Sequence, residues 1–184
     1  YYGLQMQLVV YMDAAMQAEQ RKHPDCQVRP AGIFYYNVKD PMLQKEMEED
    51  LDELDPEIFK KLKMNGLVMD DRDVIENLDR TTISLPLSYT TKGTLRKGSS
   101  VASETEFELL DAYVKKKITD IRESILNGNA EAAPYEMGNR NACTYCPYQG
   151  TCGFDRKIPG YEFRRLKQFA DEEIWKAFAK EVED

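Results

Sequence analysis

Three cysteines near the C-terminal end constrain this chain more than any other feature. They lie in the run Cys143-Thr-Tyr-Cys146-Pro-Tyr-Gln-Gly-Thr-Cys152, a C-x2-C-x5-C pattern. A two-residue gap allows a tight turn that aims two sulfurs at one centre, as in zinc and iron–sulfur sites. A closed structural site needs four donors, so the pattern predicts a metal site that lacks one ligand within the cluster.

The residues around the cysteines support a metal site rather than a set of free thiols. A proline and two glycines permit tight turns, and three rings are expected to shield a cluster from water: Tyr145, Tyr148 and Phe154. No histidine follows, which excludes a finger with two cysteine and two histidine ligands. Clustered cysteines without a secretory signal indicate a reducing compartment and a metal, not a disulfide framework. The remote Cys26 is interpreted as an unremarkable surface thiol.

Composition limits the class of protein. The 184 residues suffice for one sizeable domain, with or without a small appendage, and no apolar run is long enough to span a membrane. The net charge of -8 argues against a simple nucleic-acid-coating module. The charge is uneven, however, because residues 1–80 carry 10 basic and 17 acidic side chains whereas residues 81–184 carry 15 and 16, with basic clusters at 115–117 and 164–167. The start at Tyr1, without Met or a leader, leads us to expect the interior of a longer chain.

The hydrophobic pattern predicts an α/β chain. Helices are expected over residues 3–23, 42–64, 104–127 and 171–182, and strands over 31–39 and 83–89. Ser103 and Glu106 form a capping box before the third helix. The first helix is apolar around most of its circumference and is expected to be buried on more than one side. Gly66 is expected to cap the end of the second helix, and residues 91–100 to form an exposed hairpin or loop.

Other candidate sites are weaker. The stretch 93–100 imitates a phosphate loop but lacks the lysine after its second glycine, so it is interpreted as a flexible loop. The acidic run in 42–64 is interpreted as a solvated helix face rather than a divalent-cation site, and His23 as a surface residue. Gln7 and Tyr11 stand four residues apart and share a helix face. Spacing alone favours a partly buried glutamine beside a core tyrosine, with a functional pair as the alternative.

Together these segments resemble a known family. Gly3-Leu4-Gln5-Met6-Gln7-Leu8-Val9-Val10-Tyr11 resembles the Q-x3-Y helix motif of RecB-type PD-(D/E)XK nucleases. The strand beginning Ala31-Gly32-Ile33 and the final cysteine run, with Phe154 and Asp155, are similar to segments of the AddB-type subunits of bacterial AddAB helicase–nucleases. The order and separation of these segments fit along essentially the whole chain.

The resemblance implies a fold, cofactors and partners. The chain is expected to be the C-terminal half of a PD-(D/E)XK nuclease domain (1–134) followed by an iron–sulfur cysteine loop and a C-terminal helix (135–184). A [4Fe-4S] cluster would bind Cys143, Cys146 and Cys152, with a fourth cysteine upstream of residue 1. The metal-binding acids and the lysine of the family also precede residue 1, so Mg²⁺ would bind outside this chain. Gln7 and Tyr11 would support the active site.

The implied function is ATP-dependent degradation of DNA ends during recombinational repair, with an AddA-type helicase subunit as partner, in the cytoplasm and away from any membrane. By itself the chain is expected to be inactive as a nuclease. Two alternatives stay open at this point. One is a zinc-stapled module without catalysis, and the other is a CRISPR-adaptation exonuclease, which the long 42–134 segment fits poorly.

Overall fold

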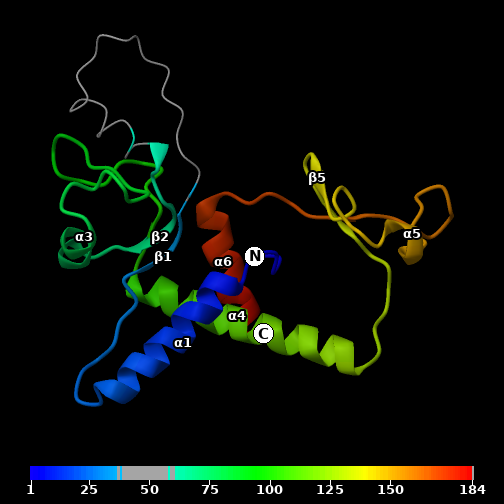
Figure 1. Ribbon diagram of the computed structural model, residues 1–184, viewed down its shortest axis with the longest axis horizontal. Coiled ribbons are helices and arrows are strands. Elements are labelled where there is room, and N and C mark those ends of the chain that lie inside the picture. The colour runs from blue at the N-terminus through cyan, green and yellow to red at the C-terminus, as the bar shows by residue number, and fades with distance from the viewer. Residues whose placement is uncertain (37, 39–57, 59–60, 184) are drawn as a thin grey trace, which may run out of the picture. The chain divides into compact units, whose positions relative to one another are not determined.

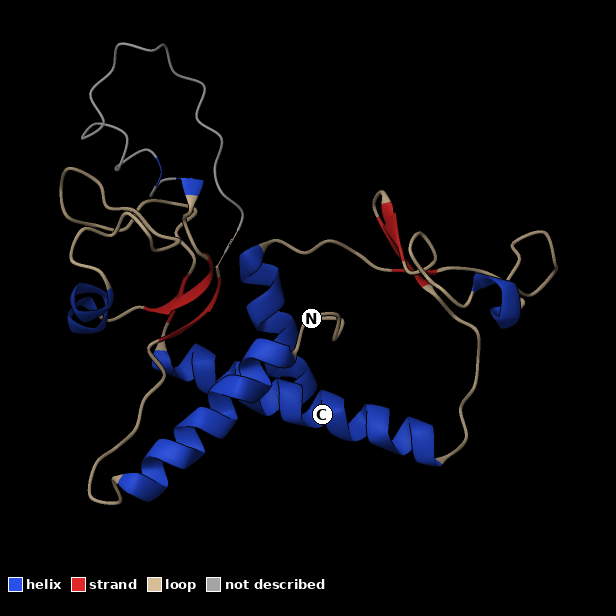
Figure 2. Ribbon diagram, viewed as in Figure 1, coloured by secondary structure: helices blue, strands red, loops and turns tan. Residues whose placement is uncertain are grey.

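The structure, a computed structural model, describes residues 1–36, 38, 58 and 61–183 (Figure 1). The described helices include α1 (Gln7–Lys22), α3 (Arg72–Leu78), α4 (Glu104–Leu126), α5 (Gln149–Cys152) and α6 (Asp171–Glu183). The strands are β1 (Gly32–Tyr35), β2 (Asn65–Met69), β3 (Val101–Ala102), β4 (Tyr135–Met137), β5 (Arg140–Asn141) and β6 (Arg164–Arg165). Helices and two small sheets occur together, as Figure 2 shows, which confirms the α/β class.

The chain divides into two compact units, residues 5–111 and residues 1–4 with 112–184. In the first unit, β1 pairs antiparallel with β2, and β2 pairs in parallel with β3. One buried cluster of this unit contains the side chains of Val68, Ile75, Leu85 and Leu87. Partly buried neighbours, including Phe34 and Tyr89, pack against them. A small apolar core thus holds the sheet, α3 and the loops that follow α3.

Electrostatic and capping contacts order the same unit. The Asp71 side chain caps α3 by accepting hydrogen bonds from the backbone N–H groups of Asp73 (2.9 Å) and Val74 (3.3 Å). Arg29 forms ion pairs with Asp71 (3.0 Å) and with Glu104 (3.2 Å). These hydrogen bonds, the one from Val74 first and that from Arg29 next, lower the pKa of Asp71. The charged Asp71 side chain therefore links Arg29, which lies just before β1, to the start of α3.

The second unit is held by aromatic rings. Tyr113 and Phe178 are buried with ring centroids 4.4 Å apart, and Tyr1 stacks on Tyr113 at 5.6 Å. The Tyr113 hydroxyl donates a 2.5 Å hydrogen bond to the Tyr1 carbonyl. Burial raises the pKa of Tyr113, and a hydrogen bond to Glu181 raises the pKa of Tyr1 to about 12. Both hydroxyls therefore stay protonated at neutral pH.

Several elements differ from the sequence-based expectation. Helix α1 begins at Gln7 rather than at residue 3, and Val9 is its one buried residue, so burial on several sides is wrong. The strand expected over 31–39 is shorter, Gly32–Tyr35, and most of the 42–64 helix lies outside the described residues. Gly66 is part of β2 and caps no helix. Residues 83–88 form no strand, although Leu85 and Leu87 are buried as their alternation suggests.

The helices expected near 104–127 and 171–182 are confirmed within one residue at each end. The capping box is present, because the Glu106 carboxylate accepts from the Ser103 backbone N–H at 2.7 Å. The apolar stripe of α4 is buried at Phe107 and Val114, whereas Ile118, Ile121 and Ile125 are exposed. Among the described residues, no helix combines the length and apolar character needed to cross a membrane.

Candidate functional site

The cysteine run lies between two strands of the second sheet, whose order is β5-β4-β6. The backbone N–H of Cys143 donates to the Asn141 side chain at 2.9 Å, which places the first cysteine directly after β5. The N–H of Cys146 donates to the Cys143 carbonyl at 3.2 Å, which closes the C-x2-C turn. Cys152 ends the short helix α5, and Gly153 follows it with a φ of +70°. The C-x2-C turn thus carries Cys143 and Cys146, and the short helix α5 carries Cys152.

All three thiols are free; Cys143 and Cys146 are half-buried and Cys152 is exposed. Across residues 1–36, 38, 58 and 61–183, no three His, Cys, Asp or Glu side chains gather into a group that could hold a metal ion. The donor chemistry nevertheless suits a soft metal or an iron–sulfur cluster, because thiolates are the ligands that both prefer. The chain therefore supplies three cysteine donors, which the structure does not gather into one metal-binding group.

Three rings near the cysteines were expected to shield a cluster from water, but two of them are exposed to solvent. Tyr145 is 95% exposed and Tyr148 is 70% exposed, whereas Phe154 is half-buried. Phe154 packs edge-on against Tyr161, with centroids 5.6 Å apart, and lies 5.1 Å from Phe163. Phe154 is therefore the ring that belongs to a packed aromatic group, and the two tyrosines present open faces to solvent.

A cavity with two arginines and two glutamates in its walls adjoins this aromatic group, and Arg165 lies 3.7 Å from Glu136 within it. It has a volume of about 480 Å³, and its walls include both rings and charges: Glu136, Arg156, Tyr161, Glu162, Phe163 and Arg165. The Arg156 guanidinium lies 5.5 Å from the centre of the Phe163 ring, within cation–π range. Residues 135–168 carry six basic and three acidic side chains, although the whole chain is acidic. Arginines and open aromatic faces are the groups that contact phosphates and stack on bases.

Sequence reasoning identifies the basic cluster at 164–167 but misses the other members of this cavity. Arg156, Tyr161 and Phe163 belong to no motif in the sequence, and the structure brings them together from one loop. The alternation of aromatic residues with charges in Tyr161-Glu162-Phe163-Arg164 is the signal that could have found them.

Gln7 and Tyr11 form a direct pair on α1. The Gln7 side-chain amide donates a 2.7 Å hydrogen bond to the Tyr11 hydroxyl, and both side chains are exposed. Tyr11 is 59% exposed, so its interpretation as a core tyrosine is wrong. Its ring borders an apolar cavity of about 410 Å³ with walls from α1 and β1, among them Met12, Met16 and Phe34. The polar ends of the pair therefore face solvent while the tyrosine ring borders that cavity.

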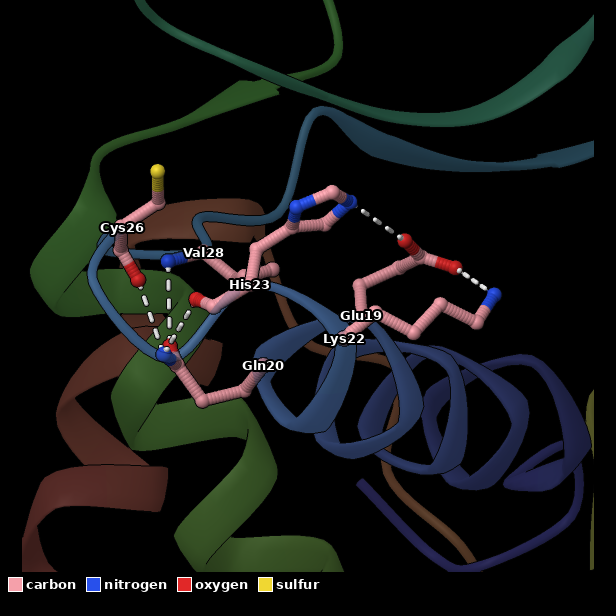
Figure 3. A network of polar contacts seen from close by, with 6 residues as sticks. All are labelled: Glu19, Gln20, Lys22, His23, Cys26 and Val28. Carbon is pink, nitrogen blue, oxygen red and sulfur yellow. Dashed lines mark hydrogen bonds and ion pairs between the residues drawn. The ribbon is translucent and has the colours of Figure 1, made fainter.

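The end of α1 carries His23 and Cys26, and Figure 3 shows their contacts. The Gln20 side chain donates to the carbonyls of His23 (3.2 Å) and Cys26 (2.8 Å) and accepts from the backbone N–H of Val28 (3.2 Å). The sulfur of Cys26 points away from this network (Figure 3) and is exposed. His23 is also exposed, which confirms it as a surface residue. These contacts close the chain after α1 and indicate a structural role.

Comparison with known proteins gives a consistent result. The family model of the PD-(D/E)XK nuclease superfamily matches residues 1–153. A protein of Thermoanaerobacter sp. (strain X514), named as the B subunit of an ATP-dependent helicase/deoxyribonuclease, is 37% identical over 186 residues, which cover 99% of this chain and 16% of the relative. A protein of the same name from Lachnoclostridium phytofermentans is 40% identical over 199 residues, which cover 100% of this chain and 17% of the relative. The chain thus spans about a sixth of the length of these relatives.

Proposed function

Because the chain belongs to the PD-(D/E)XK nuclease superfamily, among relatives named as B subunits of ATP-dependent helicase/deoxyribonucleases, we propose that it is the C-terminal half of a DNA-degrading nuclease domain. The observation that carries the proposal is similarity along the entire chain, from the Gln7 helix to the cysteine run. The full-length protein would hydrolyse phosphodiester bonds at DNA ends during recombinational repair in the cytoplasm, together with an AddA-type helicase subunit.

Mg²⁺, when bound in such a nuclease, activates water and stabilises the charge that develops on the phosphate. We place the ligands of this ion in sequence upstream of residue 1, as the resemblance to the family implies. Among the described residues, no three His, Cys, Asp or Glu side chains form a group that could hold a metal ion. The contribution of this chain is then to position other groups. Gln7 holds the Tyr11 hydroxyl at 2.7 Å on an exposed helix face, and this polar pair would orient DNA or a neighbouring catalytic group.

A substitution on α1 tests the proposal. In the full-length protein, Gln7→Ala should lower kcat for Mg²⁺-dependent DNA degradation by about tenfold or more, because misplaced groups weaken transition-state contacts. KM and thermal stability should change little, since the side chain is exposed. The measurement is release of acid-soluble nucleotides from linear duplex DNA.

Helix α1 offers a matched control for that measurement. Gln17 donates a 2.8 Å hydrogen bond to Asp13, also four residues away and also exposed. Gln17→Ala should therefore leave kcat unchanged. Equal effects of the two substitutions would assign Gln7 to helix stability alone, and a full-length protein without nuclease activity would refute the proposed function.

We also propose that Cys143, Cys146 and Cys152 hold three corners of a [4Fe-4S] cluster, with a fourth cysteine upstream. Such a cluster would join the cysteine loop to upstream chain as a structural staple, and it would take no part in electron transfer. The turns at Cys143–Cys146 and at α5 support this assignment by presenting thiols on short, hydrogen-bonded segments. The open rings of Tyr145 and Tyr148 and the neighbouring arginines would contact DNA beside it.

Anaerobic purification of the full-length protein checks the cluster. We expect bound iron and sulfide with broad visible absorbance, and Cys146→Ser should reduce all three by at least about tenfold because one ligand is lost. Cys26→Ser should keep them, since that thiol is exposed and outside the cysteine run. A colourless protein that binds zinc would instead favour the zinc-stapled module.

A further inference from the structure

One segment of the first unit is cationic in a chain whose net charge is -8. Residues 80–103, called the basic segment below, contain four cations and no Asp or Glu: Arg80, Lys92, Arg96 and Lys97. The segment is also rich in serine and threonine hydroxyls. Neither the cysteine loop nor the Gln7–Tyr11 pair involves any of these residues. Hydroxyls, cations and free backbone N–H groups together are the donors that proteins use toward phosphate oxygens.

The tip of the basic segment is a hairpin fixed to the core. Tyr89 and Leu95 form an antiparallel bridge, and both side chains pack on the cluster around Leu85 and Leu87. The N–H of Thr90 donates to the Thr94 carbonyl at 2.7 Å, and the two hydroxyls of these threonines lie 2.8 Å apart. The hairpin is thus held in place, which reduces the entropy lost when a ligand binds.

A second set of contacts fixes the segment that follows the hairpin turn, residues 96–99. The N–H of Arg96 donates to the Ser88 carbonyl at 2.8 Å, and the Arg96 Nε donates to the Tyr89 carbonyl at 3.1 Å. The Ser99 hydroxyl donates to the Ser88 carbonyl at 3.3 Å and accepts from the Ser88 N–H at 3.2 Å. The Arg96 guanidinium is consequently oriented through its Nε, and its terminal nitrogens form no hydrogen bond or ion pair with a described residue.

The tip is open to an approaching molecule. Gly93 and Gly98 adopt φ values of +77° and +92°, and a Cβ on either would meet no atom within 4 Å. Lys92 and Lys97 are exposed and form no ion pair with any residue that the structure describes. Cations without an ion-pair partner among the described residues favour a polyanion, because neither side chain must first give up a described partner.

Two acidic groups near the segment, Asp79 and Glu76, are already engaged. The Asp79 carboxylate accepts from the Thr81 hydroxyl (2.6 Å) and the Ser84 N–H (3.0 Å), and it sets the turn that begins the segment. Burial would raise the pKa of Asp79, but these hydrogen bonds outweigh it and leave the pKa lowered. A cavity of about 590 Å³ on the flank of the hairpin is lined by two acids and two arginines, Asp70, Glu76, Arg72 and Arg80, and Glu76 pairs with Arg72 at 2.8 Å. The charges in the walls of this cavity therefore balance, whereas the charged side chains of residues 89–99 are all basic.

We propose that the hairpin binds the phosphate backbone of the DNA on which the protein acts. The contacts are made by Lys92 in the turn and by Arg96 and Lys97 directly after it. This inference rests on the proposed nuclease function and adds a contact surface to it. An acidic protein surface would match the charge as well, but the hydroxyls and open glycines favour a chain of closely spaced phosphates. Each cation that contacts a phosphate displaces a counterion, so affinity depends steeply on salt.

The test measures binding of fluorescein-labelled duplex DNA to the full-length protein by anisotropy over a series of salt concentrations. The triple variant Lys92→Gln, Arg96→Gln, Lys97→Gln should reduce the slope of log affinity against log salt by about 2 to 3 and weaken binding at least about tenfold. The double variant Lys92→Gln, Lys97→Gln retains the Arg96 hydrogen bond and should reduce the slope by about 2.

A matched control removes the same charge elsewhere. Arg21, Arg122 and Lys176 are exposed and outside the basic segment, so the variant Arg21→Gln, Arg122→Gln, Lys176→Gln should keep most of the wild-type slope. If both hairpin variants degrade DNA and keep the wild-type slope of log affinity against log salt, the inference is wrong and the nuclease function stands. A wild-type protein that binds no DNA would overturn both. Displacement of DNA by polyglutamate at equal charge concentration would assign the tip to an acidic protein partner instead.

Discussion

Gly66→Ala is expected to lower the free energy of unfolding by about 3 kcal/mol or more, because the added methyl group has no room. A Cβ at this position would lie 1.9 Å from the carbonyl oxygen of Ile33 and 2.9 Å from the Cα of Phe34. Both are backbone atoms of β1, which pairs with β2 in the register Phe34 to Gly66. The strands must separate or shift to accept the methyl group.

A second glycine isolates this effect. Gly128 follows α4 with a φ of +72°, and a Cβ there would meet nothing within 4 Å. Gly128→Ala should therefore cost only the backbone penalty of a left-handed residue, about 1 to 2 kcal/mol. Urea denaturation followed by far-ultraviolet circular dichroism measures both variants. If Gly66→Ala costs no more than Gly128→Ala, the close approach of β1 to β2 is wrong.

Leu85→Ala should destabilise the protein by about 2 to 5 kcal/mol, since it removes buried methyl groups and leaves a cavity. Leu85 is 1% exposed and belongs to the cluster with Val68, Ile75 and Leu87. Tyr89 and Leu95, which carry the hairpin, pack on the same cluster. We therefore expect the same substitution to loosen the hairpin and to weaken the salt-dependent binding of DNA.

The control for this prediction is Leu78, at the end of α3, which is 42% exposed. Leu78→Ala deletes the same atoms but should cost less than about 1 kcal/mol because water already reaches the side chain. Chemical denaturation gives both values, and proton exchange of the hairpin amides reports its loosening. Similar costs for the two leucines would contradict the assignment of Leu85 to a buried core.

Local sequence signals predicted the helices best. The capping box and the repeated 3-4 spacing placed α4 within one residue, because such signals act within a single helix. The alternation in 83–89 correctly marked Leu85 and Leu87 as buried, yet no ladder forms there. Alternation states which side chains face the core, whereas pairing depends on a partner strand that is distant in sequence. Gly66 was misassigned for the same reason, since its role depends on contact with Ile33.

In the candidate site, too, some features follow from local sequence and others from contacts between distant residues. The spacing of Cys143, Cys146 and Cys152 specifies their donor chemistry, and the pairing of Gln7 with Tyr11 follows from the helical repeat. The sequence by itself therefore determined the family, the main helices and the candidate donors. Only the tertiary structure decided that Tyr11 faces solvent and that the basic hairpin is anchored on a core. Exposure and anchoring depend on contacts between residues far apart in the chain, which local patterns do not encode.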